Sequence, residues 1–160
     1  MSEIAIRSAD EDDAPLILRF IHELADYERL RDQVRLNEAD VRALLFGPVP
    51  HAFCDIAEVA SVPVGFAFWF YSVSTFEGHR GLYLEDLYVR PAARGAGVGK
   101  ALLAHLAKRC LDEGLKRMEW AVLDWNADAI AFYDRIGATA KTEWITRKLT
   151  GEALERLGAS

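Results

Sequence analysis

The sequence is poor in cysteine and contains no long apolar run. Its two cysteines, Cys54 and Cys110, lie in apolar periodic segments without the spacing of metal ligands, so we expect free buried thiols and no metal site. The first residues are acidic and lack an apolar stretch, which argues against a signal peptide. No segment reaches the length of a membrane span. We therefore expect a cytoplasmic protein with no membrane partner.

Positive charge is also scarce. The chain has 19 lysines and arginines against 25 acidic residues, a formal net charge of −6, and this argues against nucleic acid as a partner because nucleic-acid binders usually carry a basic patch. A negative field concentrates cations and suits a cationic substrate, although the same charge also serves solubility alone. With 160 residues, 51% of them hydrophobic, and no repeat or linker, we expect a single domain over residues 1–160.

A glycine-rich turn is the most informative segment that is present: Arg94, Gly95, Ala96, Gly97, Val98, Gly99 and Lys100. It follows an apolar strand pattern and precedes a helical one. Glycines allow positive φ and close approach of the backbone, and a helix start offers unpaired N–H groups to an anion. A nucleoside-triphosphate loop would need glycine in place of Arg94, and a dinucleotide loop would need glycine in place of Lys100. An anion site of another kind, or a plain turn without a ligand, fits the spacing.

Periodicity predicts an α/β chain. We expect strands at residues 3–7, 52–59, 62–71, 82–89, 118–123 and 142–149, with breaks at 60–61 and 78–81. We expect five helices. The first opens at residues 8–10, the second begins after Asn37, and the third covers 101–110 and ends at Gly114. The fourth covers 127–136, and a short fifth helix lies at the C-terminus. The order predicts a mixed sheet flanked by helices, mostly antiparallel in its N-terminal part and followed by a β-α-β-α half.

Four motifs then occur in one order along the chain. They are Tyr83-Leu84-Glu85-Asp86-Leu87-Tyr88-Val89, the glycine-rich turn, Trp125-Asn126, and Ala131-Phe132-Tyr133-Asp134-Arg135-Ile136-Gly137-Ala138. Together they resemble the GNAT superfamily of N-acetyltransferases, and more narrowly its spermidine/spermine (diamine) branch. The first-helix segment Leu24-Ala25-Asp26-Tyr27-Glu28 is also similar to that branch. The similarity runs from about Ile6 to Leu154 and implies the GNAT acyl-CoA N-acyltransferase fold.

The resemblance implies acetyl-CoA as co-substrate, bound by the end of one strand, the glycine-rich turn and the next helix. The implied residues are Leu87, Tyr88, Val89, Arg94, Gly95, Ala96, Gly97, Val98, Gly99, Lys100, Asn126 and Tyr133. Backbone N–H groups near residues 87–89 would meet the oxyanion that forms during acyl transfer. Asn126 would either contact the pantetheine or only cap the following helix.

Two residues are the candidates for acid–base catalysis. An alkylammonium must lose a proton before it attacks a thioester, and Glu85 is the candidate base, or else the anchor for the substrate charge. Strand alternation would place Glu85 on one face with Leu87 and leave Asp86 on the other. A carboxylate among apolar neighbours would have a raised pKa. By the resemblance, Tyr133 is the general acid that protonates the departing thiolate.

The amine site is implied at Tyr27, Glu28, Glu85, Trp120 and Asp124, where acids and aromatics would attract a flexible cation. A solvated helix end would explain the first two of these equally well. The segment before Trp144 carries fewer acids than is usual in the branch. This weakens the case for a long polyamine such as spermine and leaves room for shorter amines or basic amino acids.

The predicted function is transfer of an acetyl group from acetyl-CoA to a primary amine of a small cationic substrate. The alternatives are acetylation of a protein or peptide amine, and an acyl-CoA-binding module without turnover. A homodimer is implied by the resemblance. The aromatic strand over residues 66–71 would suit either burial by a partner or a central place in the sheet.

Overall fold

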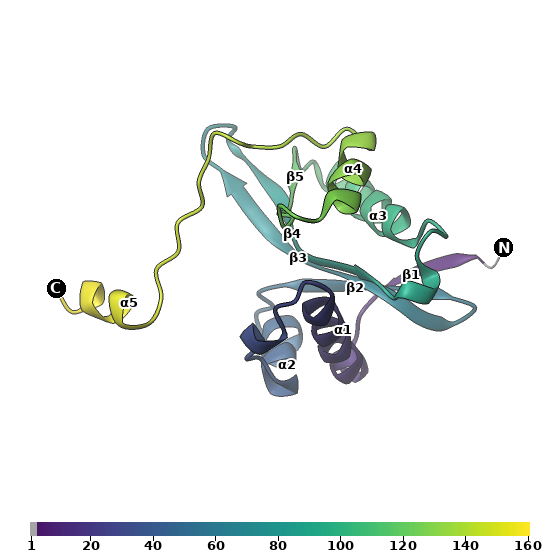
Figure 1. Cartoon of the computed structure of the whole chain (residues 1–160), viewed down its shortest axis with the longest axis horizontal. Helices are drawn as coiled ribbons and strands as arrows, with labels where there is room; N and C mark the ends of the chain where they lie inside the picture. Colours follow the sequence, from purple (N-terminus) through teal and green to yellow (C-terminus); the bar gives the residue numbers. More distant parts are fainter. Residues whose placement is uncertain (1–2) are drawn as a thin grey trace. The chain divides into compact units, whose positions relative to one another are not determined.

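The computed structural model describes residues 3–160, so residues 1 and 2 of the acidic start lie outside it. The chain forms two compact units, Met1–Ala121 and Val122–Ser160 (Figure 1). The prediction of a single domain over residues 1–160 stays a prediction. Within residues 3–160, no helix is both long enough and apolar enough to cross a membrane.

The first unit is built on a five-stranded sheet in the order β1-β2-β3-β4-β5. The strands are β1 (Ile4–Ser8), β2 (Phe53–Val59), β3 (Val62–Ser74), β4 (His79–Val89) and β5 (Met118–Glu119). The first four pair antiparallel and β5 pairs parallel to β4. This confirms the predicted mixed sheet, and it makes aromatic β3 the central strand.

Helices cover both faces of this sheet. Helices α1 (Ala14–Tyr27) and α2 (Glu38–Phe46) lie on one face and α3 (Val98–Glu113) on the other (Figure 1). On the α1 face, Phe20 stacks on Phe66 of β3 with ring centroids 5.3 Å apart. On the α3 face, the Arg109 guanidinium lies 5.1 Å from the ring centre of Trp69. Burial of large side chains on both faces supplies the main driving force for this layered arrangement.

Local signals in the sequence fix several helix ends. Asn37 caps α2 in a reciprocal capping box with Asp40, as its position in the sequence predicts. Gly114 ends α3 in the left-handed conformation, with φ of 68°. The turn between β2 and β3 is at Ala60 and Ser61, which both have positive φ.

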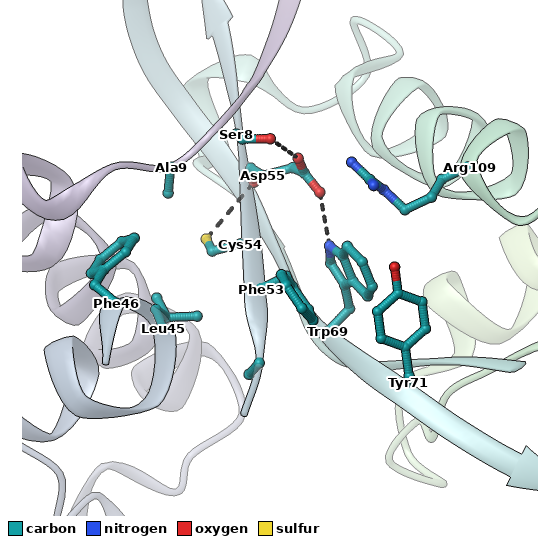
Figure 2. Close-up of a pocket in the computed structure, with 11 residues that line it drawn as sticks. Ser8, Ala9, Leu45, Phe46, Phe53, Cys54, Asp55, Trp69, Tyr71 and Arg109 are labelled. Atoms are coloured by element: carbon teal, nitrogen blue, oxygen red, sulfur yellow. Dashed lines mark hydrogen bonds between the residues drawn. The ribbon is translucent and has the colours of Figure 1, made fainter. Parts of the chain in front are cut away.

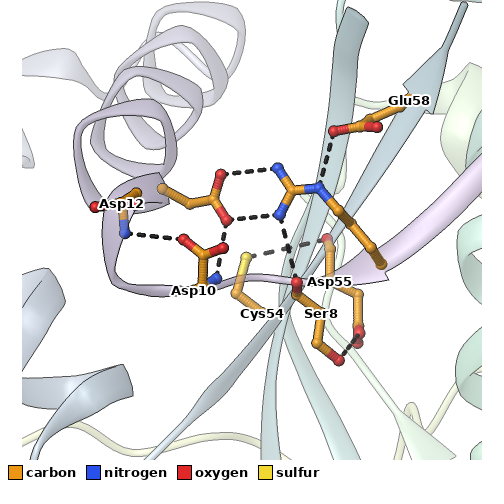
Figure 3. A network of polar contacts seen from close by, with 8 residues as sticks. Ser8, Asp10, Asp12, Cys54, Asp55 and Glu58 are labelled. Carbon is orange, nitrogen blue, oxygen red and sulfur yellow. Dashed lines mark hydrogen bonds and ion pairs between the residues drawn. The ribbon is translucent and has the colours of Figure 1, made fainter. Parts of the chain in front are cut away.

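An ion network holds the start of α1 against the sheet (Figure 3). Arg7 of β1 donates two hydrogen bonds to Asp13, at 2.7 and 2.8 Å, and one to Glu58 of β2 at 2.8 Å. The guanidinium of Arg7 lowers the pKa of the Asp13 carboxyl. Asp13 also accepts from the backbone of Asp10, so the same carboxylate closes the chain reversal before α1.

The predicted start of β4 and the predicted end of β5 are wrong. Gly81 lies inside β4 and is no break, because an added Cβ there would approach Ser72 Oγ to 2.9 Å; the glycine permits close packing. The turn lies instead before His79, at Gly78 with φ of 69°. Strand β5 has two residues in place of the six predicted at 118–123, because it pairs only with Leu82 and Tyr83, just before β4 bulges.

The second unit contains α4 (Ala127–Arg135) and α5 (Gly151–Gly158). Residues 142–149, predicted as a strand, have no regular secondary structure. A strand needs a neighbour for its backbone hydrogen bonds, and within residues 3–160 none pairs with this segment. Trp144 and Ile145 in it are 67% and 81% exposed.

Candidate functional site

A β-bulge in β4 sets the geometry of the site. Leu84 pairs with Trp69 and Asp86 pairs with Phe68, so Glu85 is the extra residue that no residue of β3 opposes. A bulge re-aims the side chains that follow it, because the two-residue alternation shifts by one. The predicted alternation through Glu85 is therefore wrong: Tyr83 stacks on Phe70 of the α1 face, and Asp86 lies on that same face opposite Phe68.

Asp86 has the electrostatic surroundings that the sequence reasoning gave to Glu85. Burial raises the pKa of Asp86 to about 7, with further contributions from the nearby charges of Glu85 and Glu28. Glu85 itself is exposed. Burial also raises the pKa of Glu28, which caps the C-terminal end of α1. We call Glu28, Glu85 and Asp86 the acidic cluster. It combines the end of α1 with β4, and its negative charge favours binding of a cation.

The sequence reasoning missed Asp86 because it relied on unbroken strand alternation. No residue type in Tyr83 to Val89 marks a bulge, since bulge position depends on how two strands pair. The only usable signal was the adjacent pair of carboxylates in an otherwise apolar strand. Of the other predicted amine-site residues in this unit, Tyr27 is the last residue of α1 and Trp120 directly follows β5.

The glycine-rich turn forms an open backbone cradle at the start of α3. Gly95 and Gly97 have φ of 80° and 85°, which favours glycine, and an added Cβ at either would meet no atom within 4 Å. No side chain caps the first turn of α3, so its leading N–H groups point out of the helix end. The turn follows β4, which ends at Val89, after Arg90 and a short 3-10 helix at Pro91–Ala93.

These features fit the anionic part of acetyl-CoA. A 16-residue helix carries a positive partial charge at its N-terminus. The backbone of Val98, Gly99 and Lys100 would offer donors, while Arg94 and Lys100 would add cationic charge to the same end of the helix. Leu87, Tyr88 and Val89 lead into the turn at the end of β4, as predicted. Ala96 lies between the two left-handed glycines.

The remaining predicted site residues belong to the second unit. Asn126 caps α4, its side-chain oxygen accepting from the N–H of Ala129 at 3.3 Å. This is the capping role that the sequence reasoning left open. Tyr133 lies in α4 and is half-buried, with its ring centre 5.6 Å from that of Phe132. Asp124 is exposed before α4.

A separate cavity of about 250 Å³ lies in the first unit, where β2 begins (Figure 2). Asp55, 2% exposed, accepts from Trp69 Nε1 at 2.8 Å and from Ser8 Oγ at 3.3 Å beside it. His105 Nε2 of α3 lies 3.4 Å from the same carboxylate. The residues that line this cavity include none of those predicted for acetyl transfer. Arg109, which contributes to it, is eleven residues along α3 from Val98, or about 16 Å at the rise of an α-helix.

Comparisons with known proteins agree with the fold. The model of the acetyltransferase (GNAT) family matches residues 17–138. The thialysine N-epsilon-acetyltransferase of Bos taurus is 41% identical over 98% of both chains. A spermidine/spermine N(1)-acetyltransferase-like protein of Homo sapiens is 36% identical over 86% of this chain and 21% of its own length. An integron cassette protein from the mobile metagenome of V. cholerae aligns with a TM-score of 0.81 and 28% identity over 100% of this chain and 99% of its own.

The family match covers the acidic cluster, the glycine-rich turn and α4, so the motifs that suggested the resemblance lie inside it. The narrower resemblance to the spermidine/spermine branch is confirmed by the human relative and by the bovine one. Members of this family use acetyl-CoA, which fits the anion cradle described above. The chain belongs to the acetyltransferase (GNAT) family and is an acetyltransferase enzyme.

Proposed function

We propose that this enzyme acetylates a primary amine of a small cationic substrate of the thialysine or short-diamine kind. The acidic cluster carries the proposal, because Glu28, Glu85 and Asp86 together favour a compact ligand with more than one positive charge. The bovine relative named for thialysine supports the substrate class. Thialysine and short diamines share a terminal primary amine on a flexible chain and a second charged group.

The acidic cluster also supplies the base that the reaction needs. A group with a pKa of about 7 can accept a proton near neutral pH, and Asp86 meets this condition. We propose that Asp86 and Glu85 share the two tasks of taking the proton and holding the remaining charge. Acetyl-CoA supplies the acetyl thioester when bound. Tyr133 is the proposed acid, because its hydroxyl can give a proton to a thiolate.

A panel of amines tests this proposal. We would measure release of the CoA thiol with acetyl-CoA and thialysine, lysine, ornithine, 1,3-diaminopropane, spermidine, spermine and a short peptide. We expect the highest kcat/KM with thialysine or a short diamine and the lowest with the peptide. Tyr133→Phe, which removes only the hydroxyl, should lower kcat with little change in acetyl-CoA affinity.

The panel also separates the competing functions. A peptide amine used better than every small amine would favour a protein acetyltransferase and overturn the proposed substrate class. Binding of acetyl-CoA without thiol release for any amine at millimolar concentration would favour a binding module. An unchanged kcat in Tyr133→Phe would remove Tyr133 as the acid.

We further propose that the enzyme is a homodimer. The C-terminal segment exposes several large apolar side chains: Trp144, Ile145, Leu149, Leu154 and Leu157. Its strand-like pattern at residues 142–149 finds no pairing neighbour within the described chain. A second copy of the chain would supply both a neighbouring strand edge and an apolar surface.

We also propose a cytoplasmic setting for the enzyme. Both cysteines are free and buried, and burial raises the pKa of the Cys54 thiol well above its ordinary value. Buried unpaired thiols are typical of a reducing compartment such as the cytoplasm.

A further inference from the structure

One face of α1 is directed at Arg90, just before the glycine-rich turn, and at Arg94, its first residue. The Arg90 guanidinium lies 4.8 Å from the ring centre of Phe20, and the Arg94 guanidinium lies 4.6 Å from that of Tyr27. Phe20 and Tyr27 are seven residues apart, two helical turns, and so share a face. Between them, Glu23 accepts from Arg90 Nε at 3.1 Å and from Nη2 at 2.9 Å. We call Phe20, Glu23 and Tyr27 the α1 stripe.

Two residues at the end of β4 also contact Arg94. Its Nε donates to the carbonyl of Val89 at 2.8 Å, and its guanidinium lies 5.6 Å from the ring centre of Tyr88. Its terminal nitrogens make no hydrogen bond or ion pair with residues 3–160. The guanidinium is therefore fixed by two rings and one carbonyl, while its two terminal N–H₂ groups are left for another partner.

Arg94 opens the cradle, three residues before Gly97 caps α3. A fixed guanidinium at this place adds charge to the helix N-terminus without a loss of side-chain freedom when an anion binds. The ring of Tyr27 is the part of the stripe that contacts Arg94. Tyr27 is 40% exposed at the last residue of α1, so little core packing depends on it.

We infer that Tyr27 is a positioning residue for acetyl-CoA, which it affects through Arg94, and that the amine contacts of this helix end come from Glu28. This rests on the proposed function of the cradle as the acetyl-CoA phosphate site. It revises the expectation from sequence that Tyr27 lines the amine site. The contact between Tyr27 and Arg94 thereby links the end of α1, which carries Glu28 of the acidic cluster, to the turn that binds acetyl-CoA.

Direct binding of acetyl-CoA, measured by titration calorimetry, tests the inference independently of turnover. Tyr27→Leu should weaken acetyl-CoA binding by about 2- to 5-fold, the size expected for an exposed cation–π contact. Tyr27→Phe keeps the ring and should stay within about 2-fold of wild type. The KM of the best amine should change less than the acetyl-CoA Kd in both variants.

Two controls separate positioning from general damage. In an Arg94→Gln background, Tyr27→Leu should have no further effect on the acetyl-CoA Kd, because the two residues act as one unit. Tyr71→Leu removes a comparable contact, with Arg80 at 4.8 Å, away from the cradle. It should leave the acetyl-CoA Kd unchanged.

Three outcomes would overturn the inference. An unchanged acetyl-CoA Kd in Tyr27→Leu with a raised amine KM would return Tyr27 to the amine site. Effects of Tyr27→Leu and Arg94→Gln that simply add would show that Tyr27 does not act through Arg94. A wild-type enzyme that binds no acetyl-CoA would overturn the proposed function and this inference together, whereas the first two outcomes leave the proposed function intact.

Discussion

Asp86 and Glu85 are neighbours in the chain, yet their surroundings differ. Glu85 is exposed at the bulge, whereas Asp86 is half-buried on the α1 face opposite Phe68. Burial penalises the charged form of a carboxyl, and the charges of Glu85 and Glu28 add to the penalty. A bound ammonium would favour the charged form of the carboxyl and offset that penalty, so the carboxyl attracts a cationic substrate.

The raised pKa of Asp86 has a consequence for stability. Between the unfolded pKa near 4 and the folded pKa of about 7, the folded protein binds a proton that the unfolded chain has released. The stabilising contribution is complete below about pH 4 and is lost as the pH rises towards 7. In the absence of substrate, the free energy of unfolding should therefore fall by up to about 1.4 kcal/mol per pH unit through this range because of Asp86. We expect Asp86→Asn to remove this contribution to the slope.

Urea denaturation at pH 5, 6, 7 and 8 measures this effect. The quantity of interest is the difference between wild type and Asp86→Asn, because histidines also titrate in this range. Glu85→Gln is the matched control: it removes one neighbouring charge and should reduce the slope only in part. Parallel stability profiles for wild type and Asp86→Asn would show that Asp86 has no raised pKa.

At the scale of elements, the parts predicted correctly were those with a local cause. The capping box at Asn37 and the left-handed Gly114 each depend on a few adjacent residues. The bulge at Glu85 and the two-residue length of β5 depend on pairing between strands far apart in sequence. Glycine was read as a turn at Gly81, where it in fact allows close packing.

The candidate site divides in the same way. The left-handed glycines of the turn and the end of β4 follow from spacing and residue type, and the cap at Asn126 is one of the two roles that the sequence left open. The position of Asp86 and the contact of Tyr27 with Arg94 do not, because they depend on which faces of α1 and β4 meet. No local pattern in the sequence determines how α1 packs against β4.

Gly65 of β3 offers a test of how closely β3 and β4 must approach beside the cradle. It lies opposite Val89, and an added Cβ would come within 2.5 Å of the carbonyl oxygen of Tyr88 and 3.3 Å of the Cα of Val89. Backbone atoms in a central sheet cannot move away without distorting the ladder. We expect Gly65→Ala to destabilise the fold by about 2–3 kcal/mol and to weaken acetyl-CoA binding, because Val89 leads into the turn.

Chemical denaturation and calorimetry with acetyl-CoA check this expectation. Gly158→Ala is the matched control, since an added Cβ there meets no atom within 4 Å. That variant should change stability by less than about 1 kcal/mol. Equal stability of the two variants would mean that β4 can shift away from β3 at little cost.

At the scale of the whole molecule, the apolar surface is unevenly distributed. The aromatic strand β3, which the sequence left open as a partner surface, is the central strand of the sheet, and Phe66 and Trp69 in it are almost wholly buried. The C-terminal segment is the opposite case, with Trp144 and Ile145 largely exposed. The proposed dimer contact therefore belongs to the second unit and leaves the sheet core uninvolved.

Sedimentation velocity over a range of protein concentrations tests the dimer. If the segment pairs with a second copy, replacing Trp144 and Ile145 by serine should raise the dimer dissociation constant at least about 10-fold, because burying each large apolar side chain is worth more than about 1.4 kcal/mol. Leu111→Ser on α3 is the matched control, since Leu111 is also 81% exposed and should leave the dissociation constant unchanged. A wild-type chain that sediments as a monomer at every concentration would overturn the dimer, and a dimer weakened by Leu111→Ser alone would move the contact to α3.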